Sequence, residues 1–245
     1  MSEFVLEPDI TIDEDHLERI VDGSRRCCFR IPGQPFCVKF YRTPAEYTKK
    51  TRRSVRTSIF FSRFCLWFNV NYHEACYHAR LRKRLPPDLF AAFPEQMRMV
   101  FSRKRGWGVI ESLIENADGS AIRPVAVEMR EAEDRALCER LYRAMAKLFD
   151  QLAEHSVCFY DPPNTMVQWT GPDEFRLRIV DFEPMGRALI PGLSLIPIYV
   201  RHKVRRRCTR YLKRMRESYL APLPDEDGGA AALSARRRRL RRRGS

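Results

Sequence analysis

Apolar and charged residues alternate over residues 175–180, with the period of a β-strand that buries one face. The predicted strand ends at Asp181, which would present a carboxylate at its C-terminal end. Earlier in the chain, the apolar runs 27–31 and 36–41 flank the turn at residues 32–35, Pro-Gly-Gln-Pro. Two apolar runs around such a turn predict a β-hairpin.

The remaining pattern divides into strands early in the chain and helices late. Residues 94–101 and 107–114 predict a second antiparallel strand pair joined by a basic turn. Three segments have helical character: 71–85, 128–155 and 199–219. Two prolines end the first. The second has an apolar stripe at steps of three or four, formed by Leu137, Leu141, Met145, Leu148 and Leu152. This order of elements predicts an α+β fold.

Composition and charge allow one domain or two lobes that share a cleft, because the chain has 245 residues of which 44% are hydrophobic. The net charge is +14, and seven arginines within residues 236–243 account for half of it. We expect the tail 222–245 to be disordered. Nine further Lys and Arg residues lie between Arg201 and Arg216. A chain this basic favours nucleic acid, anionic lipid or phosphate-bearing substrates as partners.

Two segments bear on the location of the protein. Residues 1–22 are an acidic leader without the basic and then apolar run of a signal peptide. The eight cysteines show no C-x-x-C spacing. We therefore expect reduced thiols and a cytoplasmic protein.

Residues 43–70 are basic and then rich in aromatic residues, and their apolar part is too short to cross a bilayer. They predict an inserted helix that packs on the fold or, alternatively, one that lies on an anionic membrane.

Five residues have the chemistry of nucleotide-dependent phosphoryl transfer. Lys39 lies inside an apolar strand, where it either points to solvent or points into a cleft to neutralise ATP phosphates, and Glu74 on the helix 71–85 is its natural carboxylate partner. In-line transfer needs a carboxylate near the acceptor hydroxyl and oxygen ligands for Mg²⁺. Asp161, Asn164 and Asp181 supply that set on neighbouring segments.

Three segments together resemble the PhoP regulatory network protein YrbL family, a bacterial group with a protein-kinase-like fold. They are residues 37–41 (Cys-Val-Lys-Phe-Tyr), residues 73–81 (His-Glu-Ala-Cys-Tyr-His-Ala-Arg-Leu), and Leu195-Ile196-Pro197 followed by residues 201–207 (Arg-His-Lys-Val-Arg-Arg-Arg). The likeness covers roughly residues 20–216.

The resemblance implies a bilobal kinase-like fold with a small sheet-containing lobe over 23–116 and a mostly helical lobe over 117–221. It implies an ATP site between the lobes, with Lys39 on the phosphates, Glu74 paired with Lys39, and Asp181 on Mg²⁺. Protein kinases cover ATP with a glycine-rich loop, and Gly23 is the one glycine that this chain retains at the corresponding position. The chain departs from the kinase pattern because Asn164 follows Asp161 by three residues instead of five.

Three hypotheses about function follow. The first is an ATP-dependent phosphotransferase with Asp161 orienting the acceptor and with Asn164 and Asp181 on the metal. The second is a pseudokinase-type regulatory protein, favoured by the short spacing from Asp161 to Asn164. The third is a protein that binds anionic surfaces, a membrane or lipopolysaccharide, through its basic segments. No zinc finger, helix-turn-helix or RNA-binding signature is present, so we expect no sequence-specific nucleic-acid partner. The phosphate acceptor is not identified by the sequence.

Overall fold

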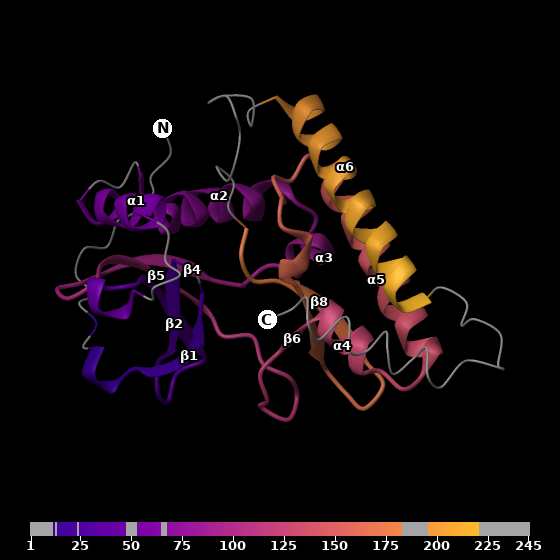
Figure 1. Ribbon diagram of the computed structural model, residues 1–245, viewed down its shortest axis with the longest axis horizontal. Coiled ribbons are helices and arrows are strands. Elements are labelled where there is room, and N and C mark those ends of the chain that lie inside the picture. Colours follow the sequence, from indigo (N-terminus) through magenta and orange to yellow (C-terminus); the bar gives the residue numbers. More distant parts are fainter. Residues whose placement is uncertain are drawn as a thin grey trace.

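The computed structural model describes residues 12, 14–23, 25–47, 53–64, 68–182 and 196–220 (Figure 1). It is an α+β structure with a five-stranded antiparallel sheet, a smaller three-stranded sheet and several helices. The first eleven residues of the expected leader and the tail 222–245 lie outside the described residues.

The larger sheet has the strand order β1-β2-β3-β5-β4. Its strands are β1 (Glu18–Asp22), β2 (Arg26–Arg30), β3 (Phe36–Tyr41), β4 (Met97–Ser102) and β5 (Gly106–Ser112). Both predicted antiparallel pairs are confirmed, β2 with β3 and β4 with β5. The first hairpin turns at Gly33, whose φ of 71° is a conformation that glycine adopts without a steric penalty. Residues 18–22, which we had expected in a leader, instead pair with β2 as the edge strand β1.

The α-helices α1, α2 and α3 lie between β3 and β4 along the chain. The helix α1 (Arg53–Phe64) belongs to the segment expected as a basic and aromatic insert; its Ile59 is buried, whereas Phe60 and Phe61 are exposed. Next, α2 (Val70–Arg84) begins at Asn69, whose side chain accepts a hydrogen bond from the backbone N–H of Tyr72. This helix packs against β4 and β5 and ends before Pro86, as the sequence predicts. The short helix α3 (Pro87–Phe90) leads into β4.

The helical part contains α4 (Val125–Glu131), α5 (Arg135–Glu154) and α6 (Pro197–Met215), which continues as a π-helical turn to Leu220. The single helix expected over 128–155 is therefore wrong: it is interrupted before Asp134, whose side chain caps α5 by accepting from the N–H of Ala136 at 2.8 Å. Helices α5 and α6 lie side by side along one flank of the molecule (Figure 1). The large core cluster joins the apolar stripes of α2, α5 and α6.

The smaller sheet has the order β6-β7-β8, with β6 (Arg123–Pro124), β7 (Thr165–Trp169) and β8 (Phe175–Ile179). The polar turn after β5 is tied to it, because the side chain of Asn116 accepts from the N–H of Trp169 at 2.8 Å and Gln168 donates to the carbonyl of Glu115 at 2.7 Å. These bonds tie the segment 113–122, which follows β5, to β7 of the smaller sheet. Among the described helices, none has the length and apolar character needed to cross a bilayer.

Candidate functional site

A pocket of about 300 Å³ lies where the larger sheet meets the smaller one. Its wall combines side chains of β1–β3 and β5, the connecting segment 113–122, and the residues around β7 and β8. The predicted residues in this wall are Gly23, Lys39, Asn164 and Asp181. Its other polar residues include Arg26, Arg30, Glu111 and Glu115.

Lys39 is buried, so the solvent-facing alternative for this residue does not hold. Its ammonium nitrogen lies 2.8 Å from Oε1 of Glu111 and donates a hydrogen bond to the carbonyl oxygen of Val180, the residue before Asp181. Burial opposes the charged amine, but the carboxylates of Glu111 and Glu74 outweigh it and raise the pKa of Lys39. Lys39 is thus a fixed positive charge in the wall of the pocket.

Glu74 pairs with Arg26 rather than with Lys39. Arg26, at the start of β2, extends one guanidinium nitrogen to Glu74 and the other to Oδ1 of Asp181, and it also donates to Oδ1 of Asn71 at 2.9 Å. Glu74 is completely buried and accepts a second hydrogen bond, 3.1 Å from the backbone N–H of Phe182. Burial alone would raise the pKa of Glu74, but Arg26 and Lys39 lower it below its ordinary value. The carboxylate therefore remains ionised while buried.

Two residues of the site, Arg26 and Glu111, were not predicted from the sequence. Glu111 is buried on β5 with Oε1 on Lys39, whereas Oε2 is buried without a hydrogen-bond partner among the described residues. Burial is the main reason that the pKa of Glu111 is raised. A glutamate inside the mostly apolar run 107–114 was the available signal, of the same kind as the lysine inside β3. A buried acceptor without a partner in the pocket wall favours a ligand that can donate a hydrogen bond there.

Asn164 and Asp181 lie next to each other in the structure. The amide nitrogen of Asn164, at the end of the short 3₁₀ turn Pro162–Asn164, donates to the main-chain carbonyl of Asp181 at 3.2 Å. The Asp181 side chain is 41% exposed and follows β8 by two residues instead of ending the strand. Asp161 precedes the 3₁₀ turn and is not among the residues that line the pocket; within the described residues its carboxylate makes no hydrogen bond.

Gly23 lies in the turn between β1 and β2. Its N–H donates to the carbonyl of Arg26 at 2.8 Å, and a Cβ added at this glycine would lie 3.0 Å from that same oxygen. The side chain of Arg42 donates to the Gly23 carbonyl at 2.8 Å. The turn is therefore close-packed, and it brings Arg26 to the pocket wall.

Phe182 fixes the backbone that carries Asp181. Its ring is buried and packs edge-on against Phe93 at 5.1 Å between centroids, with Tyr77 and His78 of α2 on its other sides. Glu183, the residue after Phe182, lies outside the described residues. The ring and the N–H of Phe182 together anchor this end of the pocket to α2.

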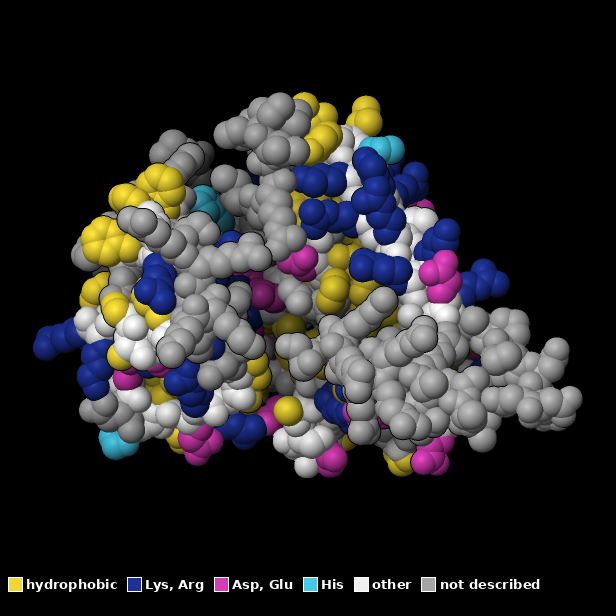
Figure 2. All heavy atoms as spheres, viewed as in Figure 1, with side chains coloured by type: hydrophobic (Ala, Val, Ile, Leu, Met, Phe, Trp, Pro, Cys, Tyr) yellow, Lys and Arg dark blue, Asp and Glu magenta, His cyan; other side chains and the backbone are white. Residues whose placement is uncertain are grey.

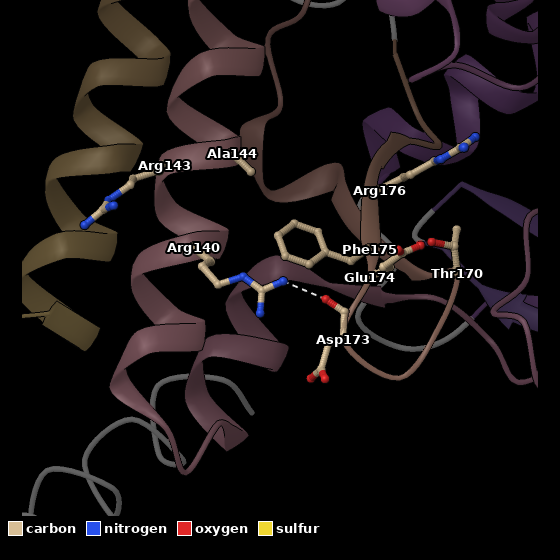
Figure 3. Close-up of a pocket in the computed structure, with 8 residues that line it drawn as sticks. All are labelled: Arg140, Arg143, Ala144, Thr170, Asp173, Glu174, Phe175 and Arg176. Atoms are coloured by element: carbon tan, nitrogen blue, oxygen red, sulfur yellow. Dashed lines mark hydrogen bonds between the residues drawn. The ribbon is translucent and has the colours of Figure 1, made fainter.

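A larger and more open pocket of about 560 Å³ lies between α5 and the turn from β7 to β8 (Figure 3). Arg140 crosses it, donating to the main-chain oxygen of Asp173 at 2.6 Å with its guanidinium 5.6 Å from the centre of the Phe175 ring. Its wall mixes three arginines with two acidic residues and contains none of the predicted site residues. The smaller pocket is therefore the candidate site, because the buried charges converge there.

Compared with known proteins, the chain matches no protein-family model and no curated protein.

Proposed function

We propose that the smaller pocket binds Mg·ATP and that the chain is a protein-kinase-like phosphotransferase, similar to the PhoP regulatory network protein YrbL family. The observation that carries this proposal is the convergence of Lys39, Asn164 and Asp181 on one pocket from three separate segments of the chain. Phosphoryl transfer depends mainly on positioning and on neutralising charge. A fixed ammonium group opposite carboxylate and amide oxygens has the chemistry for both.

The wider architecture supports a kinase-like fold. A five-stranded antiparallel sheet packs against α2, whose Glu74 is buried. A helical part follows in the sequence. The pocket lies where the larger sheet meets the smaller one. The free thiols at all seven described cysteines are in keeping with the proposed cytoplasmic location.

In this proposal Lys39 and Arg26 bind the phosphates. Lys39 is held by Glu111 and by the carbonyl of Val180, so its amine needs little reorganisation to meet a ligand. Arg26 lines the same pocket, and its ion pair with Glu74, which does not line the pocket, orients the guanidinium. A triphosphate bound between the two cations would have part of its charge compensated by groups that are already in place.

Asp181 and Asn164 would hold the metal ion. Their oxygen donors suit Mg²⁺, which usually takes one or two protein ligands and completes its coordination with water and phosphate oxygens. When bound, Mg²⁺ would neutralise charge that develops on the transferred phosphoryl group. Asp161, whose carboxylate makes no hydrogen bond within the described residues, would accept one from the acceptor hydroxyl and orient it.

A second candidate function is nucleotide binding without transfer, as in a pseudokinase-type regulatory protein. Two observations favour it: Arg26 already pairs with the carboxylate of Asp181, and Asn164 follows Asp161 by only three residues. Metal binding at Asp181 would have to compete with that guanidinium. Turnover decides between the two candidates, because both require nucleotide binding.

The test is calorimetric titration with Mg·ATP of the wild type, Lys39→Met and Asp181→Asn, with Lys83→Met as a control at an exposed lysine of α2. A charge-assisted hydrogen bond contributes about 1.5–3 kcal/mol, so Lys39→Met should bind Mg·ATP about tenfold more weakly or worse. The control Lys83→Met should bind it as tightly as the wild type. Asp181→Asn should remove the dependence of affinity on Mg²⁺. Equal affinities of the two lysine variants, or no binding by the wild type, would contradict the proposal.

A turnover assay decides between the two candidates. Transfer of the γ-phosphate by the wild type, with loss of that transfer in Asp161→Asn, would support the phosphotransferase. Nucleotide binding without transfer would support the second candidate.

A further inference from the structure

Helix α6 separates an apolar face from a strongly basic one. Its buried residues recur every three or four positions and pack on α5; they are Val200, Val204, Cys208, Tyr211 and Met215. The helix contains no acidic residue, and the positions between the buried ones are filled mainly by arginine. Figure 2 shows these Lys and Arg side chains as a dark blue stripe along α6.

The charges of this stripe are largely uncompensated within the described structure. Arg205, Arg206, Arg210 and Arg216 are exposed, and none makes an ion pair or hydrogen bond with a described residue. Lys213 approaches Glu217 at 3.9 Å, with both side chains mostly exposed. Like charges four residues apart, as at Arg206 and Arg210, destabilise a helix by a few tenths of a kcal/mol each. The stripe therefore does not serve the stability of the fold, and its potential is available to an anionic partner.

The N-terminal end of α6 adds exposed apolar side chains. Ile198 is 78% exposed and Ile196 is 48% exposed, directly beside the first arginines of the stripe. Phosphate backbones of nucleic acids attract arginine but offer no apolar phase to isoleucine. A bilayer with anionic headgroups offers both a negative surface and an acyl region.

We propose that α6, with Ile196 and Ile198, docks the protein on the surface of an anionic lipid bilayer. The basic stripe would contact the headgroups while the two isoleucines enter the boundary of the acyl region. The proposal goes beyond nucleotide binding and does not depend on it.

Docking at this surface would also bring lipid headgroups near Asp161, the residue proposed to orient the acceptor hydroxyl. Lys203 lies 4.5 Å from the centre of the Tyr160 ring, and Arg207 donates to the carbonyl oxygen of Tyr160. Tyr160 directly precedes Asp161. This consequence alone rests on the proposed function.

The test is sedimentation of the full chain with vesicles of phosphatidylcholine, with and without about 30% phosphatidylglycerol. We expect binding only to the anionic vesicles, and strong weakening between about 0.1 M and about 1 M salt. A basic residue near such a surface contributes about 1 kcal/mol, so replacing Arg205, Arg206 and Arg210 together by Gln should weaken binding about a hundredfold. Ile198→Ser should weaken it about tenfold and leave the salt dependence unchanged.

The matched control replaces Arg98, Arg103 and Arg176, exposed arginines on β4, in the turn after it and on β8, by Gln. Both triple variants change the net charge equally and keep the arginine-rich tail, so only the position of the lost charge differs. Equal losses in the two variants would mean diffuse attraction and would overturn the proposal. Equal binding to neutral vesicles, or displacement from anionic vesicles by equimolar duplex DNA, would overturn it as well.

Discussion

Arg26→Met is the substitution that tests the buried charge cluster most sharply. Arg26 is 9% exposed and Glu74 is fully buried, and they form an ion pair between the sheet and α2. Methionine retains much of the arginine's volume, so the variant removes the charge without opening a large cavity. Removing one partner of a buried pair costs about 3–5 kcal/mol, because the other charge stays desolvated. Glu74 keeps the N–H of Phe182 and the field of Lys39, so we expect a loss of about 3 kcal/mol.

The assay is urea denaturation of five proteins: wild type, Arg26→Met, Glu74→Gln, the double variant Arg26→Met with Glu74→Gln, and Arg30→Met. The double variant should recover much of the loss, since it removes the carboxylate left unpaired. Arg30, on the same strand, pairs with Glu115 at the partly exposed surface, and its loss should cost at most about 1 kcal/mol. A cost for Arg26→Met no larger than that for Arg30→Met, or additive effects of the two substitutions in the double variant, would refute the reasoning.

The same variant has a pH signature. Because the pKa of Glu74 is lowered from 4.5 in the folded protein, its ion pair contributes stability above pH 4.5 that is lost as the pH falls through the folded value. Without Arg26, protonation of the buried carboxyl removes an unpaired charge. The difference in stability between wild type and Arg26→Met should therefore shrink as the pH is lowered toward 4.5 and below. A difference that widens in acid would contradict the assignment.

Three further predictions follow from particular contacts. Phe182→Ala should lower the free energy of unfolding by about 3–5 kcal/mol in urea denaturation, because the ring is buried among Phe93, Tyr77 and His78. Gly108→Ala should cost about 1–3 kcal/mol in the same assay, since its Cβ would lie 2.4 Å from the ring of Phe40; a neutral outcome would mean that the ring can move aside. Hydrogen bonds from Arg105 lower the pKa of Glu46 from 4.5 to about 2, so the stability this residue contributes should be complete above pH 4.5 and disappear as the pH falls through about 2. Thermal melts of the wild type and Glu46→Gln across that range should converge in acid.

Local patterns were enough to predict most of the elements. Alternation around a Pro-Gly turn predicted the hairpin of β2 and β3, and the two prolines after Leu85 predicted the end of α2. The single helix expected over 128–155 is two helices in the structure, and residues 128–134 contain neither proline nor glycine that would mark the interruption before Asp134. Strand β1 was missed because an edge strand is specified by the neighbour with which it pairs, and five residues of mixed polarity do not reveal that neighbour.

The partners in the site depend on strand register, which the sequence does not contain. Lys39 lies opposite Val109 in β5, and Glu111 lies opposite Cys37, so Lys39 and Glu111 face the same side of the sheet on neighbouring strands. These strands are separated by a long stretch of chain that includes α1, α2, α3 and β4. A shift by one residue would turn Glu111 to the other face. Glu74 was therefore assigned to Lys39 on chemical grounds, while in the structure Arg26 from a third strand takes that place.

The central claim is that the Lys39 amine lies at the phosphates of a nucleotide held against Asp181. The most direct test treats the protein with an acyl-phosphate ester of ATP, which acylates an amine beside the phosphates: the bond from the acyl carbon to the lysine nitrogen forms as the acyl–phosphate bond breaks. Peptide mass spectrometry then locates the acylated lysines. The account predicts acylation of Lys39 that excess Mg·ATP suppresses, with less suppression in Asp181→Asn. Acylation confined to exposed lysines such as Lys83, unaffected by Mg·ATP, would contradict it.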